Sequence, residues 1–165
     1  MFHLLRVSLA VSLSFVPVAW ISTEAAPPKT PEARLLERAL QLLPEPPTVP
    51  VRLIDPELTP DPGALRKVDA FLVREPNGRI RPVIYLNRRA AIVDKALAGQ
   101  DVDVAILAAV IRHEQEHLTG GSEREACRAE RDLFQRLMFV GKVPVAEGLA
   151  YLADLAGNRQ LRERQ

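Results

Sequence analysis

Residues 113–117 read His-Glu-Gln-Glu-His, and these residue types at this spacing can support metal-dependent hydrolysis. The run lies in an apolar stretch from Val102 to Leu118 that has the pattern of a helix. Positions i and i+4 share one face of a helix, so the imidazoles of His113 and His117 can bind one metal ion. Glu114 lies beside them, where its carboxylate can accept a proton from a metal-bound water.

The histidine content of the chain supports a metal site. The sequence contains three histidines, and His3 lies in an amino-terminal leader, so the other two both belong to the motif. Histidines that serve packing or solubility would not be expected to pair at the spacing of metal ligands. The alternative is an amphipathic helix in which two histidines fall four residues apart by chance, since short motifs give false positives.

A third protein ligand is expected, because catalytic zinc usually has three protein ligands and one water. No further histidine or cysteine pair follows the motif, so this ligand should be a carboxylate. Gly120 and Gly121 end the motif helix, and Ser122 with Glu125 forms a capping box that starts another helix. Capping therefore accounts for Glu125.

The second helix, predicted over residues 123–138, carries two carboxylates on its apolar face. Glu123 and Glu130 lie there, where a carboxylate is costly unless it is paired or bound to a metal. The residues alone leave both as candidates for the third ligand, with the other held next to the site. Glu123 could also be a first-turn acid favoured by the helix dipole, and Glu130 could pair with a basic neighbour. The apolar residues of this face are Ala126, Cys127, Leu133, Phe134, Leu137 and Met138.

This segment resembles the zincin metallopeptidases, and most closely their gluzincin branch. In that branch a glutamate on a following helix completes the zinc site, often in the pattern E-x-x-A-[D/N], and residues 123–127 read Glu-Arg-Glu-Ala-Cys. The stretch is also similar to the metzincin spacing H-E-x-x-H-x-x-G-x-x-E, although Met138 lies in a helical pattern and gives no Met-turn. Both resemblances imply that Glu123 is the third ligand. Cys127 stands where such families often have Asp or Asn.

The resemblance also implies a fold. We expect an α+β, mainly α protein, a minimal zincin-like domain in which a β-hairpin or small sheet packs on the HEXXH helix and a second helix follows. The hairpin is predicted over Val68 to Asn87, because Asn77-Gly78 favours a tight turn. Its return strand, Ile80 to Asn87, is expected by resemblance to be an edge strand beside the metal cleft, where a peptide substrate can add as an extra strand.

The implied activity is peptide-bond hydrolysis by a zinc-dependent metallopeptidase. In this interpretation His113, His117 and Glu123 hold Zn²⁺, and Glu114 is the general base. The expected partner is a peptide or protein substrate. A second interpretation is a zincin-like metal-binding module of the cell envelope with little or no turnover, because no spare histidine is left to stabilise an oxyanion. Neither of the two tyrosines is assigned that role.

The amino terminus has the pattern of an export signal. Arg6 precedes an apolar run from Val7 to Ile21, which is shorter than the about 20 residues of a membrane-spanning helix, and small residues follow. We therefore expect residues 1–25 to be a signal peptide and the protein to be periplasmic or secreted. An uncleaved leader would be its connection to a membrane.

Composition and proline content predict the remaining organisation. The formal net charge of +1 gives no field that would attract nucleic acid, and a single cysteine excludes an internal disulfide. Most of the 14 prolines fall in residues 26–63, which we predict to be a linker. The linker contains one amphipathic helix, Pro31 to Leu43, interpreted as a tether. Residues 64–158 are expected to form the zincin-like domain and residues 159–165 a basic tail.

Overall fold

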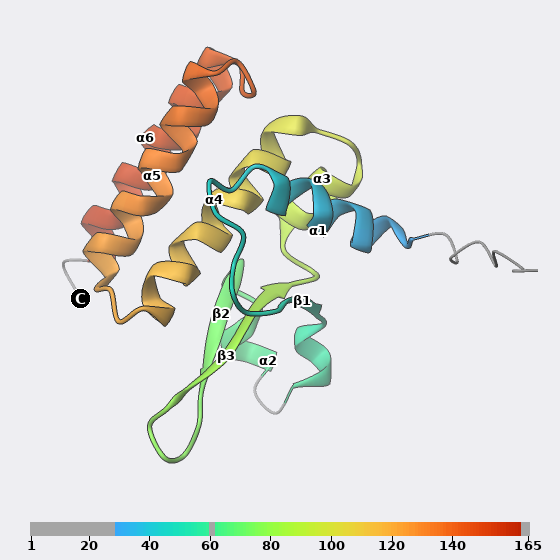
Figure 1. Ribbon diagram of the computed structural model, residues 1–165, viewed down its shortest axis with the longest axis vertical. Coiled ribbons are helices and arrows are strands. Elements are labelled where there is room, and N and C mark those ends of the chain that lie inside the picture. Colours follow the sequence, from blue (N-terminus) through green and yellow to red (C-terminus); the bar gives the residue numbers. More distant parts are fainter. Residues whose placement is uncertain (1–28, 60–61, 163–165) are drawn as a thin grey trace, which may run out of the picture.

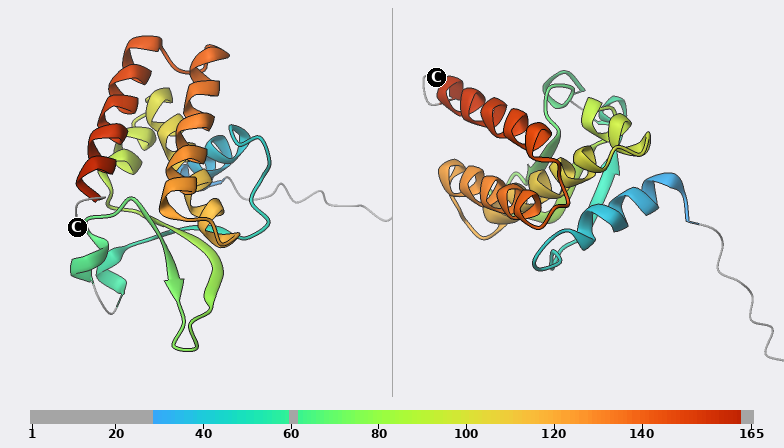
Figure 2. Two further views of the ribbon diagram at one scale, coloured as in Figure 1. Left: turned by 90° about the vertical axis from the view of Figure 1, so that its left-hand side faces the viewer. Right: turned by 90° about the horizontal axis from the view of Figure 1, so that it is seen from above.

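The computed structural model describes residues 29–59 and 62–162, and within them it is mainly helical with one small mixed sheet. This confirms the expected α+β, mainly α fold. The helices are α1 (Pro31–Gln41), α2 (Pro62–Leu65), α3 (Ala91–Leu97), α4 (Asp101–Leu118), α5 (Glu123–Phe139) and α6 (Val145–Arg162), with a 3₁₀ turn, η1 (Pro56–Leu58), and the strands are β1 (Val51–Ile54), β2 (Ala70–Arg74) and β3 (Ile80–Asn87). Helix α4 lies between the sheet and the antiparallel pair α5 and α6 (Figures 1 and 2).

The predicted hairpin is formed by β2 and β3. The two strands pair antiparallel, with Phe71 opposite Tyr85 and their rings stacked at a centroid distance of 5.4 Å. The turn closes through hydrogen bonds from the Glu75 N–H to the Arg79 carbonyl (2.8 Å) and from the Gly78 N–H to the Glu75 carbonyl (2.9 Å), and Gly78 has φ +82, a conformation that suits glycine. The Asn-Gly signal therefore identified this turn correctly.

Strand β3 is central, so the prediction that it forms the sheet edge is wrong. The strand order is β1-β3-β2, and β1 pairs parallel to β3 from Val51 opposite Ile84 to Ile54 opposite Asn87. Pro82, which has no N–H, lies before the first of these paired positions, so β1 can pair with β3 without needing that donor. The edge strand beside α4 is β2.

The proline-rich segment is not only a linker. Thr30 caps α1 by accepting a hydrogen bond from the Ala33 N–H (3.1 Å), and Leu35 and Ala39 of its apolar stripe are 2% and 0% exposed. These side chains join the core around α4, and β1 joins the sheet. The tether interpretation and the domain boundary at residue 64 are therefore wrong, because burying this stripe stabilises a docked helix.

The motif helix and the helix that follows it form as the sequence predicts. Ser122 and Glu125 form the predicted capping box at the start of α5. Helix α4 has Gln100 as its N-cap residue, and Asp101 and Asp103 lie in its first turn. Helix α6 runs from Val145 to Arg162.

The two predicted terminal segments lie wholly or partly outside the described residues. Residues 1–25, the predicted signal peptide, lie outside the described residues, and so do the side chains of the predicted basic tail, residues 159–165. None of the helices in the described part of the chain combines the length and the apolar character that a membrane span requires.

Candidate metal centre

The two motif histidines and the glutamate that begins α5 converge on one point. Gly120, with φ +90, lies in the turn that brings the start of α5 back beside the end of α4. His117 Nε2 lies 3.2 Å from His113 Nε2 and 3.2 Å from Glu123 Oε2. His113 Nε2 lies 3.6 Å from the same glutamate oxygen. The structure thus brings together the three residues predicted as metal ligands.

The outer nitrogen of each imidazole faces an acceptor. His113 Nδ1 lies 2.9 Å from Glu130 Oε2, and His117 Nδ1 lies 3.0 Å from the carbonyl oxygen of Gly121. Carboxylate and carbonyl oxygens only accept hydrogen bonds, so each Nδ1 carries a proton and donates it. In the neutral histidines each Nε2 is therefore a bare lone pair directed at the point of convergence.

The three inward atoms have the spacing of ligands around a single ion. Metal–ligand bonds of about 2.0–2.2 Å place the ligand atoms of a tetrahedral site about 3.3–3.6 Å apart. The separations of 3.2, 3.2 and 3.6 Å between the two Nε2 atoms and Glu123 Oε2 are close to these values. Two lone pairs and a carboxylate oxygen repel one another unless a cation lies between them, so this donor set fits Zn²⁺.

Electrostatics at His113 also favour a positive charge. Burial opposes a charged imidazolium, but the hydrogen bond to Glu130 and the negative charges of Glu130, Glu123 and Glu114 outweigh burial and raise the pKa of His113. The carboxylates that stabilise a protonated histidine would equally stabilise a metal cation at the same place.

Glu130, the other candidate ligand, lies behind His113. Its side chain is buried, and Oε2 faces Nδ1, not the convergent Nε2 atoms. His113, Cys127 and Glu130 also form a group of close donor atoms, but the 2.9 Å separation of Nδ1 and Oε2 is a hydrogen-bond distance, shorter than the ligand spacing above. Glu130 therefore orients the ring of His113, and Glu123 is the carboxylate that faces both Nε2 atoms.

Cys127 contacts Glu123. Its Sγ lies 3.5 Å from Glu123 Oε1, as the donor of a weak hydrogen bond. The thiol thus lies beside Glu123, in the position where the resembling families often have Asp or Asn. The stronger orienting contact in this site, from Glu130 to His113, comes from one turn further along α5.

Glu114 faces a cleft of about 620 Å³ that also contains the three converging residues. Burial, the largest influence, raises the pKa of Glu114 above its ordinary value, although the neighbouring histidines oppose this shift. A carboxyl group with a raised pKa suits a residue that accepts and returns a proton near neutral pH. The β2 side of the cleft is formed by Lys67, Val68, Asp69, Ala70, Leu72 and Arg74.

Two contributors to the site were not predicted from the sequence. Gly121 supplies the carbonyl that fixes His117, and a Cβ at this position would lie 2.7 Å from Glu116 Cγ and 2.8 Å from the Glu116 carbonyl oxygen, so only glycine fits. Tyr151 of α6 donates a hydrogen bond of 2.5 Å to Glu130 Oε1. Its position next to the inward residue Leu152 was the available signal, since a hydroxyl on an apolar face needs a partner.

Comparison with known proteins gives no independent assignment. No protein-family model, curated protein or solved structure matches this chain. The zincin resemblance therefore depends on residues 113–123 and on their geometry. In the fold around them, α4 packs beside the sheet and α5, which begins at Glu123, follows it (Figure 1).

Proposed function

We propose that this protein is a zinc-dependent metallopeptidase. The observation that carries the proposal is the convergence of the Nε2 atoms of His113 and His117 with Glu123 Oε2, with both outer nitrogens held as donors. This combination fixes the tautomer that a metal ligand requires. Two histidines paired by chance would not need a carboxylate at ligand distance from both rings.

The chain's own residues account for binding, orientation and proton transfer. His113, His117 and Glu123 would hold the ion, which when bound supplies a water of lowered pKa and polarises the scissile carbonyl. Glu114 accepts the proton of the attacking water and returns it to the leaving amine. Its partial burial raises its pKa above the ordinary value, which favours a carboxylate that takes up and returns a proton.

Strand β2 supplies a place for an extended substrate. The Asn87 N–H donates to the Asp69 carbonyl (2.8 Å), so in the alternating antiparallel pattern the backbone groups of Ala70 and Leu72 point away from β3. Both residues line the cleft. A peptide that pairs with these groups would lie along the metal centre, which makes a peptide or protein the favoured substrate.

The decisive experiment compares two glutamates of the motif. Glu114→Gln should retain stoichiometric zinc and lose cleavage of a peptide library by a factor of about 100 or more, because the general base is gone. Glu116→Gln is the matched control, since Glu116 pairs with Arg112 (2.9 Å), and it should keep both properties. Full cleavage by Glu114→Gln would overturn the assigned role.

One observation favours the alternative of a metal-binding module with little turnover. Tyr151, the tyrosine that lines the cleft, already donates its hydroxyl proton to Glu130, and Tyr85 stacks on Phe71 away from the cleft lining. Neither is placed to stabilise an oxyanion in this structure. Zinc bound at one equivalent without chelator-sensitive cleavage of any library peptide would select this alternative.

A further inference from the structure

A chain of buried polar contacts connects the metal centre to the last helix. His113 on α4 faces Glu130 on α5 (2.9 Å), and Glu130 accepts the hydroxyl proton of Tyr151 on α6 (2.5 Å). The Glu130 side chain is only 8% exposed, and each of its two oxygens faces one of these protein donors. Burial and the charge of Glu130 raise the pKa of Tyr151, which therefore remains a donor at any physiological pH.

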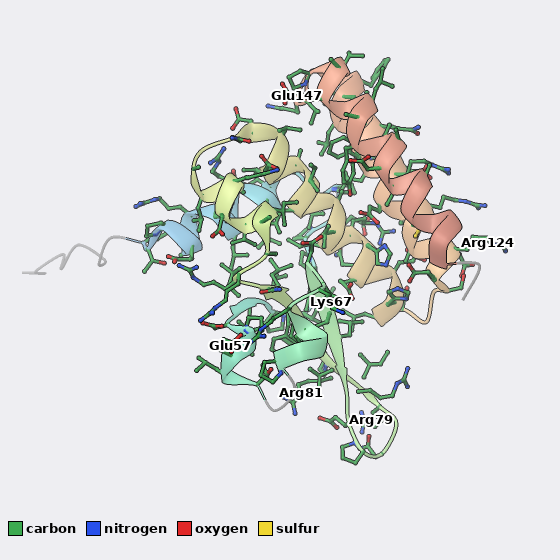
Figure 3. All side chains as sticks on the ribbon, turned by 180° about the vertical axis from the view of Figure 1, so that it is seen from behind. Glu57, Lys67, Arg79, Arg81, Arg124 and Glu147 are labelled. Carbon is green, nitrogen blue, oxygen red and sulfur yellow. The ribbon has the colours of Figure 1, made fainter. Side chains whose placement is uncertain are left out.

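The position of Tyr151 makes this contact central to the docking of α6. Helix α6 lies along α5 and on the outside of the fold, with Glu147 and Arg124 marking opposite ends of the pair (Figures 1 and 3). The Tyr151 ring packs on Phe134 at a centroid distance of 4.4 Å. In contrast, Val145 and Leu149 of the same helix are 62% and 58% exposed, so apolar anchoring is concentrated near the tyrosine.

We infer that Tyr151, acting through Glu130, is a positioning residue for the metal ligand His113, and that docking of α6 and metal binding are coupled. This inference builds on the metal centre of the proposed function. With Tyr151 in place, Glu130 is held by a second donor and keeps its other oxygen on His113 Nδ1. That contact fixes the ring and leaves Nε2 free to bind the ion.

The coupling must be reciprocal, because both events share Glu130. If docked α6 strengthens zinc binding by some factor, bound zinc strengthens docking of α6 by the same factor. Bound zinc should therefore protect α6 from hydrogen exchange, although α6 contributes no ligand. Removing the hydroxyl should reduce both effects together.

The test uses the full chain and zinc ion alone, with affinity measured by competition against a chromophoric chelator. Tyr151→Phe should weaken zinc binding about fivefold or more, the lower end of typical coupling between sites. Glu130→Gln should weaken it about 10- to 100-fold, as for other residues that orient metal ligands. Tyr85→Phe is the matched control, since its hydroxyl accepts only a 3.5 Å contact from Arg81, and it should change nothing.

Hydrogen exchange of α6 with and without zinc gives a second measurement that does not depend on activity. Zinc should slow hydrogen exchange in α6 of the wild type and of Tyr85→Phe. The slowing should be smaller in Tyr151→Phe. Unchanged zinc affinity in a folded Tyr151→Phe variant, or an equal loss in Tyr85→Phe, would overturn the inference while leaving the proposed function intact. Failure of the wild type to bind zinc would overturn both.

Discussion

Glu123 and Glu130 approach opposite nitrogens of the same imidazole: Glu123 Oε2 lies 3.6 Å from His113 Nε2, and Glu130 Oε2 lies 2.9 Å from His113 Nδ1. Seven residues apart on α5, they lie on the same face about two turns from each other. Helix α5 therefore supplies both the proposed ligand and the group that orients another ligand. The crossing of α4 and α5 decides which carboxylate takes which role.

This division of roles predicts different effects for neighbouring acids of α5. Glu123→Gln should weaken zinc binding by more than the about 100-fold that loss of an orienting residue can cost, because a direct ligand is removed. Glu125→Gln makes the same charge change two residues away and should leave the zinc affinity unchanged, since glutamine can keep the capping box. Competition titrations of both variants check this. Equal zinc affinities in both would show that Glu123 is not a ligand.

A second prediction concerns Asp103, in the first turn of α4. This residue is 6% exposed, and its buried Oδ2 has no hydrogen-bond partner among the described residues. Burial, the main cause, raises the pKa of Asp103; Glu147 adds to the shift and Lys95 opposes it. The folded chain therefore holds this proton to a higher pH than the unfolded chain does.

The sign of the resulting pH dependence follows from linkage. Above the unfolded pKa of about 3.9, the unfolded state releases the Asp103 proton first, so stability falls as pH rises until the folded group has also ionised. Asp103→Asn removes this loss and should be more stable than wild type at pH 7, by about 1 kcal/mol. Urea unfolding at pH 3.5 and pH 7 measures the difference, which should shrink at the lower pH.

Asp101→Asn is the control for this experiment. Asp101 lies in the same turn, but its side chain is 80% exposed and pairs with Arg38. Removing its charge should lower stability at pH 7 by a few tenths of a kcal/mol, about the value of an exposed ion pair. A gain in stability in Asp101→Asn equal to that in Asp103→Asn would assign the effect to the helix terminus and not to burial.

The sequence predicted the local elements that position the residues of the candidate site. The spacing of His113 and His117, the capping box at Ser122, and the placing of Glu123 and Glu130 on one face are properties of single helices, and the structure has all of them. Helical periodicity and side-chain capping depend on neighbours within a few residues, so they can be recognised without tertiary information.

The features that the sequence analysis predicted wrongly or missed all depend on packing between distant segments. β1 pairs with β3 across about 30 residues of sequence, and this pairing makes β3 the central strand. The proline-rich composition around Val51 gave no indication of a strand there. The burial of Leu35 likewise required α4 as a partner. Tyr151 gained its role only when α6 folded back on α5, and no sequence pattern indicates that Glu130 is its acceptor.

The last prediction tests how closely α6 approaches α5. Gly148 is buried in α6, and a Cβ added there would clash with Met138 Sδ and lie 2.6 Å from Met138 Cγ. Alanine raises helix propensity by about 1 kcal/mol over glycine. Overpacking a close contact costs about 1–3 kcal/mol, so Gly148→Ala should have a net loss of about 1 kcal/mol in the free energy of unfolding.

Gly157→Ala provides the opposite case in the same helix. A Cβ at this exposed position would meet nothing within 4 Å, so the propensity term acts alone and the variant should gain up to about 1 kcal/mol. Urea unfolding of both variants, with equal m-values, measures the difference as a shift in midpoint. A gain in stability in Gly148→Ala like that in Gly157→Ala would mean that Met138 moves aside freely. The close approach of α6 to α5 would then not be what holds Tyr151 against Glu130.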